Sequence, residues 1–336
     1  MQAFGEAWLA GTRKNWPGVL LATVIAIAAT FIAESRGGPT LLYALLLGMA
    51  LQAVSAEGTA GPGADFAAKR ILRLGVALLG ARITLEQLGG LGWFNGGLII
   101  AGMVATIGFG IAMSRVFGLD RRLGVLTGGA TAICGASAAI AIAAVLPRNE
   151  STEERALVFT IAGVTVLSTL AMILYPLIIT GLNLSPEDAG VFLGGTIHDV
   201  AQVVGAGYSI SSETGDYAVL TKMLRVAMLL PVVLIVSIAT QRRTAVAGSQ
   251  DQPALVPTFL LGFVLLVIAG SLGWIPAALG GALSELSRAC LVIAIAAVGL
   301  KTSLLEIRKV GRRAALLLAS EALFLVGFML LVQHFN

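Results

Sequence analysis

The chain alternates long apolar stretches with short polar connections. Apolar runs of about 17 to 25 residues recur along its whole length, and such runs can cross the hydrocarbon core at about 1.5 Å of rise per residue. They are apolar on every face, which predicts helices surrounded by lipid or protein. About eleven transmembrane segments are predicted, at residues 17–33, 40–55, 67–84, 94–117, 123–146, 155–180, 188–208, 216–240, 257–273, 285–303 and 314–333.

Composition supports one membrane domain and nothing else. Of 336 residues, 57% are hydrophobic and 12% charged, and the mean hydropathy is +0.93. We therefore expect a single transmembrane transporter domain over 1–336, with 1–16 as a cytoplasmic leader and 241–256 as a cytoplasmic linker. The net charge of +4 is spread over the loops without a basic patch interleaved with aromatics, so nucleic-acid binding has no support.

The distribution of Lys and Arg predicts the orientation. With the N-terminus inside, fifteen of the 22 basic residues fall at inner ends and loops and five at outer ones. Because cytoplasmic loops carry the excess of Lys and Arg, this asymmetry favours a cytoplasmic N-terminus, an outer C-terminus and an odd number of spans. The two remaining basic residues, Lys222 and Arg225, fall inside the eighth span.

An internal echo suggests an inverted repeat. Residues 80–92 (GARITLEQLGGLG) resemble residues 299–311 (GLKTSLLEIRKVG) at a constant offset, with Arg82 opposite Lys301. The topology places these two residues on opposite sides of the membrane, as an inverted repeat of a secondary transporter requires. Chance similarity of Gly- and Leu-rich sequence is the alternative.

Two glycine-rich segments are predicted to interrupt their helices halfway across the membrane. They are residues 127–138 (TGGATAICGASA) and residues 194–208 (GGTIHDVAQVVGAGY). Irregular backbone at this depth is tolerated where it lines a cavity, and discontinuous helices form the central sites of many transporters. Close helix packing through small residues is the alternative for both segments.

Ionisable residues at bilayer depth mark the candidate site. His198 and Asp199 lie in the second glycine-rich segment, while Lys222 and Arg225, three residues apart, share a helix face. Polar groups at this depth are costly and are usually functional. Two cations against one carboxylate leave positive charge for an anionic substrate. The alternative is a buried ion pair between Arg225 and Asp199.

The proposed roles follow from this arrangement. His198 and Asp199 are expected to couple protons, because histidine titrates near physiological pH. A neutral histidine bonded to a backbone carbonyl is the alternative. No catalytic residue, metal site or cofactor is expected, because the HDVAQ segment lacks a second ligand at metal-binding spacing. The residues expected to bind substrate are Gly129, Thr131, Cys134, Gly135, Ser137, Gln202, Lys222 and Arg225.

Four segments together carry a family resemblance: LRLGVALLGARITL, GGATAICGASAAIA, GTIHDVAQVVGAG and the KMLR element at Lys222–Arg225. Over residues 35–333 the chain resembles the YeiH-like family of bacterial inner-membrane proteins, named as sulfate exporters from genetic context. The resemblance implies a fold related to cation/proton antiporters and bile-acid transporters, with crossed discontinuous helices. The family often has glutamate where this chain has Asp199. Both interrupted spans run outward here, so either the span count is off by one or only one of them is a crossing helix.

These observations predict an all-α polytopic membrane protein with the inverted-repeat fold of a secondary transporter. We expect export of a small anion, such as sulfate or a related sulfur oxyanion, across the inner membrane, with protons as the coupling ion. The partners are the anion, protons or sodium, the lipid bilayer and, as a further alternative, a second copy in a homodimer. The alternatives are a sodium-coupled carrier in which Asp199 and Gln202 bind the ion, and a channel or structural membrane protein.

Overall fold

The computed structural model describes residues 2–37, 39–81, 83, 89, 92–146, 153–239, 258–302 and 312–334. Its regular elements within these ranges are helices. They are α1 (Gln2–Arg36), α2 (Thr40–Ala50), α3 (Gln52–Glu57), α4 (Gly61–Phe66), the π-helix η1 (Ala67–Ile71), α5 (Leu72–Leu79), α7 (Gly92–Val116), α8 (Arg121–Ala132), α9 (Ala136–Val145), α10 (Glu153–Leu182), α11 (Pro186–Thr196), α12 (Val200–Ile210), α13 (Ser212–Ala227), α14 (Leu229–Ala239), α15 (Thr258–Ser271), α16 (Ala277–Lys301) and α17 (Arg312–His334).

Length and apolar composition identify the helices that can cross a membrane. Among the described residues, six segments qualify, and the shorter apolar helices include α2, α9, α12 and α15. The six segments are Lys14–Arg36, Gly92–Val116, Ala156–Leu182, Ser212–Ala239, Ala278–Lys301 and Arg312–His334. The all-helical membrane class predicted from hydropathy is therefore confirmed.

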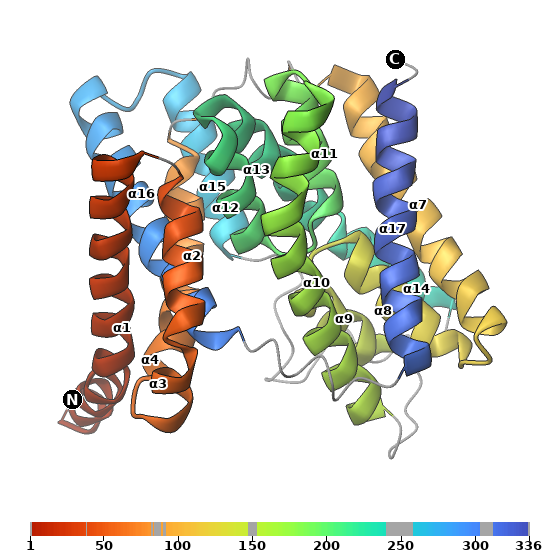
Figure 1. Cartoon of the computed structure of the whole chain (residues 1–336), viewed down its shortest axis with the longest axis horizontal. Helices are drawn as coiled ribbons and strands as arrows, with labels where there is room; N and C mark the ends of the chain where they lie inside the picture. The colour runs from red at the N-terminus through yellow and green to blue at the C-terminus, as the bar shows by residue number, and fades with distance from the viewer. Residues whose placement is uncertain are drawn as a thin grey trace.

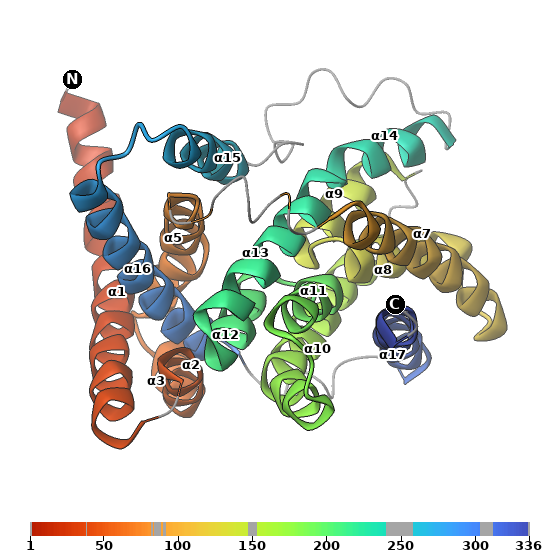
Figure 2. The same ribbon diagram turned by 90° about the horizontal axis from the view of Figure 1, so that it is seen from above.

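The helices form two bundles, visible side by side in Figures 1 and 2. The first bundle consists of α1–α5, α15 and α16, and the second of α7–α14 and α17. Close backbone approach holds the first bundle together: a Cβ on Gly48 of α2 would lie 2.3 Å from the carbonyl oxygen of Ala296 on α16. Contacts between the bundles run chiefly from α12 to α2 and α16.

Side-chain contacts fix the helix directions in the second bundle. At one end, Asn95 Nδ2 donates to Glu187 Oε1 at 3.2 Å and Gln333 Nε2 donates to the Asp188 carbonyl at 3.0 Å. The starts of α7 and α11 and the end of α17 therefore share this end, which carries the C-terminus in Figure 1. At the opposite end, Gly118 lies near Arg313, so the end of α7 and the start of α17 meet there.

The first predicted interruption is a hairpin, which we call the first hairpin (α8–α9). A Cβ on Gly129 of α8 would lie 2.2 Å from Cδ1 of Ile142 on α9. In a straight helix these residues would be about 20 Å apart. The chain therefore enters at the α17 N-terminal end of the bundle, turns at residues 133–135 and returns.

The second interruption is also a hairpin, the second hairpin (α11–α12). A Cβ on Gly190 would lie 2.9 Å from the Thr214 carbonyl oxygen, and one on Gly207 would lie 2.9 Å from Cα of Gly215. Residues 190 and 207 would be about 25 Å apart in a straight helix, yet both contact the first turn of α13. This hairpin opens at the end opposite to the first one.

These hairpins correct the sequence interpretation of residues 123–146 and 188–208 as spans. The breaks occur inside the predicted glycine-rich segments. At each break, however, the chain reverses direction instead of continuing across the bundle. Residues 2–16, expected as a leader, extend α1. The linker 241–256 lies outside the described residues, as does most of the echo between 80–92 and 299–311.

Candidate functional site

The two hairpin tips are built by local backbone conformation. Between α8 and α9, Gly135 has φ +63°, a conformation that glycine adopts without steric cost and that permits the sharp reversal. Between α11 and α12, Ile197 is extended and Asp199 serves as the N-cap of α12, accepting from the Ala201 amide at 3.2 Å. The polar and glycine residues of each segment therefore explain where the helices end.

The tips meet in the middle of the second bundle. His198 Nδ1 lies 3.0 Å from the carbonyl oxygen of Thr131, and a Cβ on Gly135 would lie 3.6 Å from the carbonyl oxygen of His198. The sequence prediction that the two interrupted segments lie together is confirmed. Because a carbonyl only accepts, His198 carries its proton on Nδ1.

Lys222 of α13 binds both tips. Its ammonium group donates to the carbonyl of Ile133 at 2.8 Å and to the carbonyl of Ile197 at 2.9 Å. The residue is fully buried. One cation thus joins the two hairpins, which belong to different parts of the chain.

Arg225, one turn further along α13, makes four hydrogen bonds to the same two tips. Nε donates to Ala132 O at 2.8 Å and Nη2 to Thr131 O at 2.8 Å in the first hairpin. Nη1 donates to Gly194 O at 2.8 Å and Ile197 O at 3.0 Å in the second. These carbonyls end α8 and α11, where helices leave acceptors unsatisfied and carry partial negative charge.

These hydrogen bonds differ from those expected for a buried ion pair between Arg225 and Asp199. Asp199 caps α12, and its own amide donates to Ser168 Oγ of α10 at 3.0 Å. Among the described residues, Arg225 has no carboxylate within ion-pair distance. Its partners are backbone carbonyls, so Arg225 organises the hairpins whether or not it also attracts an anion.

The charge at the tips can be counted with Lys222, Arg225 and Asp199 all ionised. The carbonyl ends of α8 and α11 contribute roughly half a negative charge each, and the amide ends of α9 and α12 roughly half a positive charge each. With Asp199 ionised beside Lys222 and Arg225, an excess of roughly one positive charge remains. The α9 amide end has no side-chain cap, because Gly135 occupies the N-cap.

Buried polar atoms without partners point to the same region. Among the described residues, His198 Nε2, Gln202 Oε1 and Thr221 Oγ1 are buried without a hydrogen-bond partner. Thr221 packs against Gly194 of the second hairpin. Buried polar groups are normally satisfied, so such a cluster indicates a place that a ligand, an ion or water completes.

The remaining predicted substrate residues occupy different environments. Gly129 packs against Ile142 within the first hairpin. The Thr131 hydroxyl faces α17, Cys134 is buried at the tip and Ser137 is exposed in the first turn of α9. Of the residues named here, Ser137 is the one with an exposed side chain.

Sequence reasoning missed Glu321 of α17. Its carboxyl group is fully buried and is hydrogen-bonded to Thr127 Oγ1 at 2.7 Å and to Thr131 Oγ1 at 3.3 Å. The signal was present, since Glu321 is an isolated acid inside the apolar stretch LLLASEALFLV. The rule applied to Arg225, that a charge at bilayer depth needs an explanation, selects Glu321 equally well.

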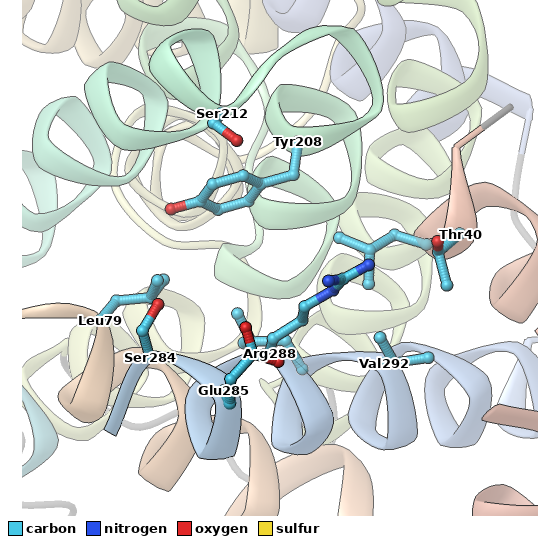
Figure 3. A pocket seen from close by; sticks show the side chains of 10 residues that line it. Thr40, Leu79, Tyr208, Ser212, Ser284, Glu285, Arg288 and Val292 are labelled. Atoms are coloured by element: carbon cyan, nitrogen blue, oxygen red, sulfur yellow. The ribbon is translucent and has the colours of Figure 1, made fainter. Parts of the chain in front are cut away.

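A cavity of about 310 Å³ lies between the two bundles, near the start of α13. Figure 3 shows Arg288 of α16 and Tyr208 of α12 projecting into it from opposite walls. The Tyr208 hydroxyl also donates to Asp216 Oδ1 at 2.6 Å. The cavity lies between the bundles at the end where the second hairpin opens.

Comparison with known proteins identifies the family. The family described as Conserved hypothetical protein 698 matches residues 17–318. The UPF0324 membrane protein TauZ of Paracoccus denitrificans is 50% identical over 321 residues, covering 95% of each chain. A UPF0324 membrane protein of Chlorobaculum tepidum is 48% identical over 94% of this chain and 88% of its own length.

More distant relatives cover the same length. A UPF0324 membrane protein of Bacillus cereus is 34% identical over 93% of both chains. No solved structure matches the chain significantly. The YeiH-like resemblance agrees with these matches, and the chain belongs to the UPF0324 family of membrane proteins.

Proposed function

We propose that this protein is a secondary transporter that exports a small anion across the bacterial inner membrane, with sulfate or a related sulfur oxyanion as the substrate class. One observation carries the proposal: two hairpins that open at opposite ends of a bundle meet tip to tip on the buried cations Lys222 and Arg225. Such a site is equally reachable from both sides if the surrounding helices shift.

The arrangement of the hairpins supports an inverted repeat. The first hairpin is followed by the long helix α10, and the second, which opens at the other end, is followed by α13 and α14. Hairpin and following helix thus occur twice in opposite orientations, which is the symmetry on which alternating access is built. This pair of units replaces the echo at 80–92 and 299–311 as the basis of the proposal.

Within the described residues, the topology that follows has nine crossing segments and two hairpins. The crossing segments are α1, α2, α4 with η1 and α5, α7, α10, α13 with α14, α15, α16 and α17. An odd number keeps the N-terminus cytoplasmic and the C-terminus outside. Because α10 then runs outward, the basic residues near its start join the cytoplasmic side, which strengthens the positive-inside bias.

An anion fits the site better than a cation for two reasons. The tips retain positive charge, and the uncapped start of α9 presents amide donors, the arrangement that binds sulfate and phosphate at helix N-termini. Ser137 adds a hydroxyl in the same turn. The oxygens of a small oxyanion would satisfy these donors.

A sodium-coupled carrier is the second candidate, because Gln202 Oε1 is buried without a donor one turn from the Asp199 carboxylate. Carboxylate and amide oxygens are the ligands that hard cations prefer. In this reading Na⁺ is the coupling ion and not the substrate. Replacing sodium by choline in the transport assay decides between the two coupling ions.

Uptake of labelled sulfate into liposomes containing the purified protein tests the function. We expect saturable uptake and counterflow, competition by sulfite or sulfonates, and affinity reduced roughly fivefold in Ser137→Ala, equivalent to one lost hydrogen bond. Ser209→Ala is the matched control, because the Ser209 hydroxyl donates to the Ala206 carbonyl of its own helix at 2.7 Å. Linear, non-saturating flux would indicate a channel, and absence of flux and of binding for the whole anion panel would overturn the proposal.

A further inference from the structure

Glu321 stands apart from the site described above, on the far side of the first hairpin. It lies in the middle of α17, fully buried, and within the described residues its two oxygens are hydrogen-bonded to threonine hydroxyls of α8. Within the described residues no Lys, Arg or His lies within ion-pair distance of it. An ionised carboxylate buried without a cation is strongly unfavourable, so the arrangement requires an explanation.

The hydrogen bonds around Glu321 accommodate the neutral acid. Thr127 Oγ1 lies 2.7 Å from Glu321 Oε1 and 2.9 Å from the Leu123 carbonyl oxygen, but a hydroxyl has one proton. If Glu321 is the neutral acid, it donates to Thr127, Thr127 donates to Leu123 and Thr131 donates to the other Glu321 oxygen. Every group is then satisfied. With an ionised Glu321 the Thr127 hydroxyl would donate to the carboxylate, and the Leu123 carbonyl would keep its helical amide donor. The cost of that form is a carboxylate buried without a cation.

The packing leaves no space for a counter-ion in this conformation. A Cβ on Gly110 of α7 would lie 2.5 Å from Glu321 Oε1, and one on Gly128 of α8 would lie 3.2 Å from Cα of Ile107. Glycines thus allow α7, α8 and α17 to close around the carboxyl group. The neutral acid is sealed while these three helices are together.

Thr131 links Glu321 to the hairpin tips. Its hydroxyl donates to Glu321, while its carbonyl accepts from Arg225 Nη2 at 2.8 Å and His198 Nδ1 at 3.0 Å. These are the titratable groups nearest to Glu321 through bonded contacts. The other charged groups on packed elements lie at helix ends: Arg115 on α7, Arg121 and Arg122 on α8, Glu187 and Asp188 on α11, and Arg312 and Arg313 on α17.

We propose that Glu321 carries the coupling proton of the transport cycle, and that its protonation holds the first hairpin against α17. The proposal rests on the proposed transport function for its role in coupling. The chemistry is a simple exchange: the carboxylic acid releases H⁺ to water on one side, becoming a carboxylate, and takes H⁺ from water on the other.

Movement follows from the cost of the ionised form. Once Glu321 has lost its proton, the carboxylate needs water or a cation, so α8 must separate from α17 to admit one. Because α8 ends at the tip held by Lys222 and Arg225, this displacement changes the anion site. His198 is less suited to the role, since its protonation would add a third positive charge beside these cations.

Infrared difference spectroscopy of the purified protein tests the titration without any substrate. We expect the C=O band of a protonated carboxyl group to disappear between about pH 5 and about pH 9 in the parent protein. The band should be missing in Glu321→Gln and kept in Glu34→Gln, an exposed acid of the first bundle. A parent spectrum without this band, or a band that survives in Glu321→Gln, overturns the proposal.

Transport in liposomes then tests the coupling. Glutamine reproduces the neutral acid, because its amide can donate to Thr127 while its oxygen accepts from Thr131, so folding should be retained. We expect Glu321→Gln to lose anion-driven proton flux by roughly tenfold or more while anion counterflow persists, and Glu34→Gln to behave as the parent. Parent-like proton flux in Glu321→Gln refutes the coupling role. Absence of anion flux in the parent itself refutes the transport function, and the spectra still decide the protonation of Glu321.

Discussion

At the scale of single residues, Lys222 and Arg225 act first as substitutes for helix caps. The carbonyl ends of α8 and α11 would otherwise face each other inside the protein with unsatisfied acceptors and like partial charges. The guanidinium of Arg225 can serve four carbonyls because its donors form a rigid planar fork. In the proposed transport function, the cations that would attract the substrate are therefore also those that hold the hairpins together.

This dual role predicts a large loss of stability in Arg225→Ala. Removal of the donor leaves several buried carbonyls unsatisfied, which costs on the order of 1 to 3 kcal/mol for each. We expect a marked fall in the apparent unfolding temperature in detergent, a partial rescue in Arg225→Lys, and a change within about 0.5 kcal/mol in the exposed control Arg288→Ala.

The same measurement of the unfolding temperature tests whether Arg225 and Asp199 form an ion pair. If the carbonyl contacts dominate, the double variant Arg225→Ala, Asp199→Ala is no more stable than Arg225→Ala alone. Recovery of stability in the double variant would instead mean that an unpaired Asp199 carboxylate caused the loss.

At the scale of elements, the hairpins depend on packing partners as much as on their turns. Gly190 and Gly194 bring α11 against α13, and Gly207 brings α12 against the same helix. A longer side chain at any of these positions would push a hairpin arm away from α13 and so displace its tip from Lys222. Glycines that resemble helix breakers in the sequence thus act partly as contact surfaces.

Accessibility to an impermeant thiol reagent tests the reversal of the chain. Single cysteines at Leu182, which ends α10, and at Ser212, which starts α13, should both react in intact cells, because the proposed topology places the opening of the second hairpin outside. Arg121→Cys, at the start of α8, should react only after permeabilisation. The parent protein is the control and should not be labelled, since Cys134 and Cys290 are buried. Protection of Leu182→Cys combined with labelling of Ser212→Cys would restore the straight span at 188–208.

At the scale of the whole molecule, the cavity between the bundles separates part of their facing surfaces. It is lined by Thr40 and Arg288 from the first bundle and by Tyr208 and Ser212 from the second (Figure 3). Direct helix contacts between the bundles run mainly through α12. A narrow contact of this kind permits one bundle to shift against the other.

Cross-linking the two walls of the cavity tests whether transport needs such a shift. With cysteines at Thr40 and Ser212, a cleavable bifunctional thiol reagent should stop sulfate flux, and reduction of the linker should restore it. Each single-cysteine variant treated in the same way is the control. Full flux in the verified cross-linked protein would show that the bundles do not need to separate here.

The amino-acid sequence by itself determined the membrane class, the positions of the two helix interruptions and the two buried cations. These follow from local properties: apolar length, glycine clusters and charges at bilayer depth. Only the tertiary structure decided that the chain reverses at both interruptions, because a broken helix and a re-entrant hairpin have the same glycines and the same length. It also decided the partners of Arg225 and Glu321, since carbonyls such as Thr131 O have no signature in the sequence and come within reach only when the hairpins pack against α13 and α17.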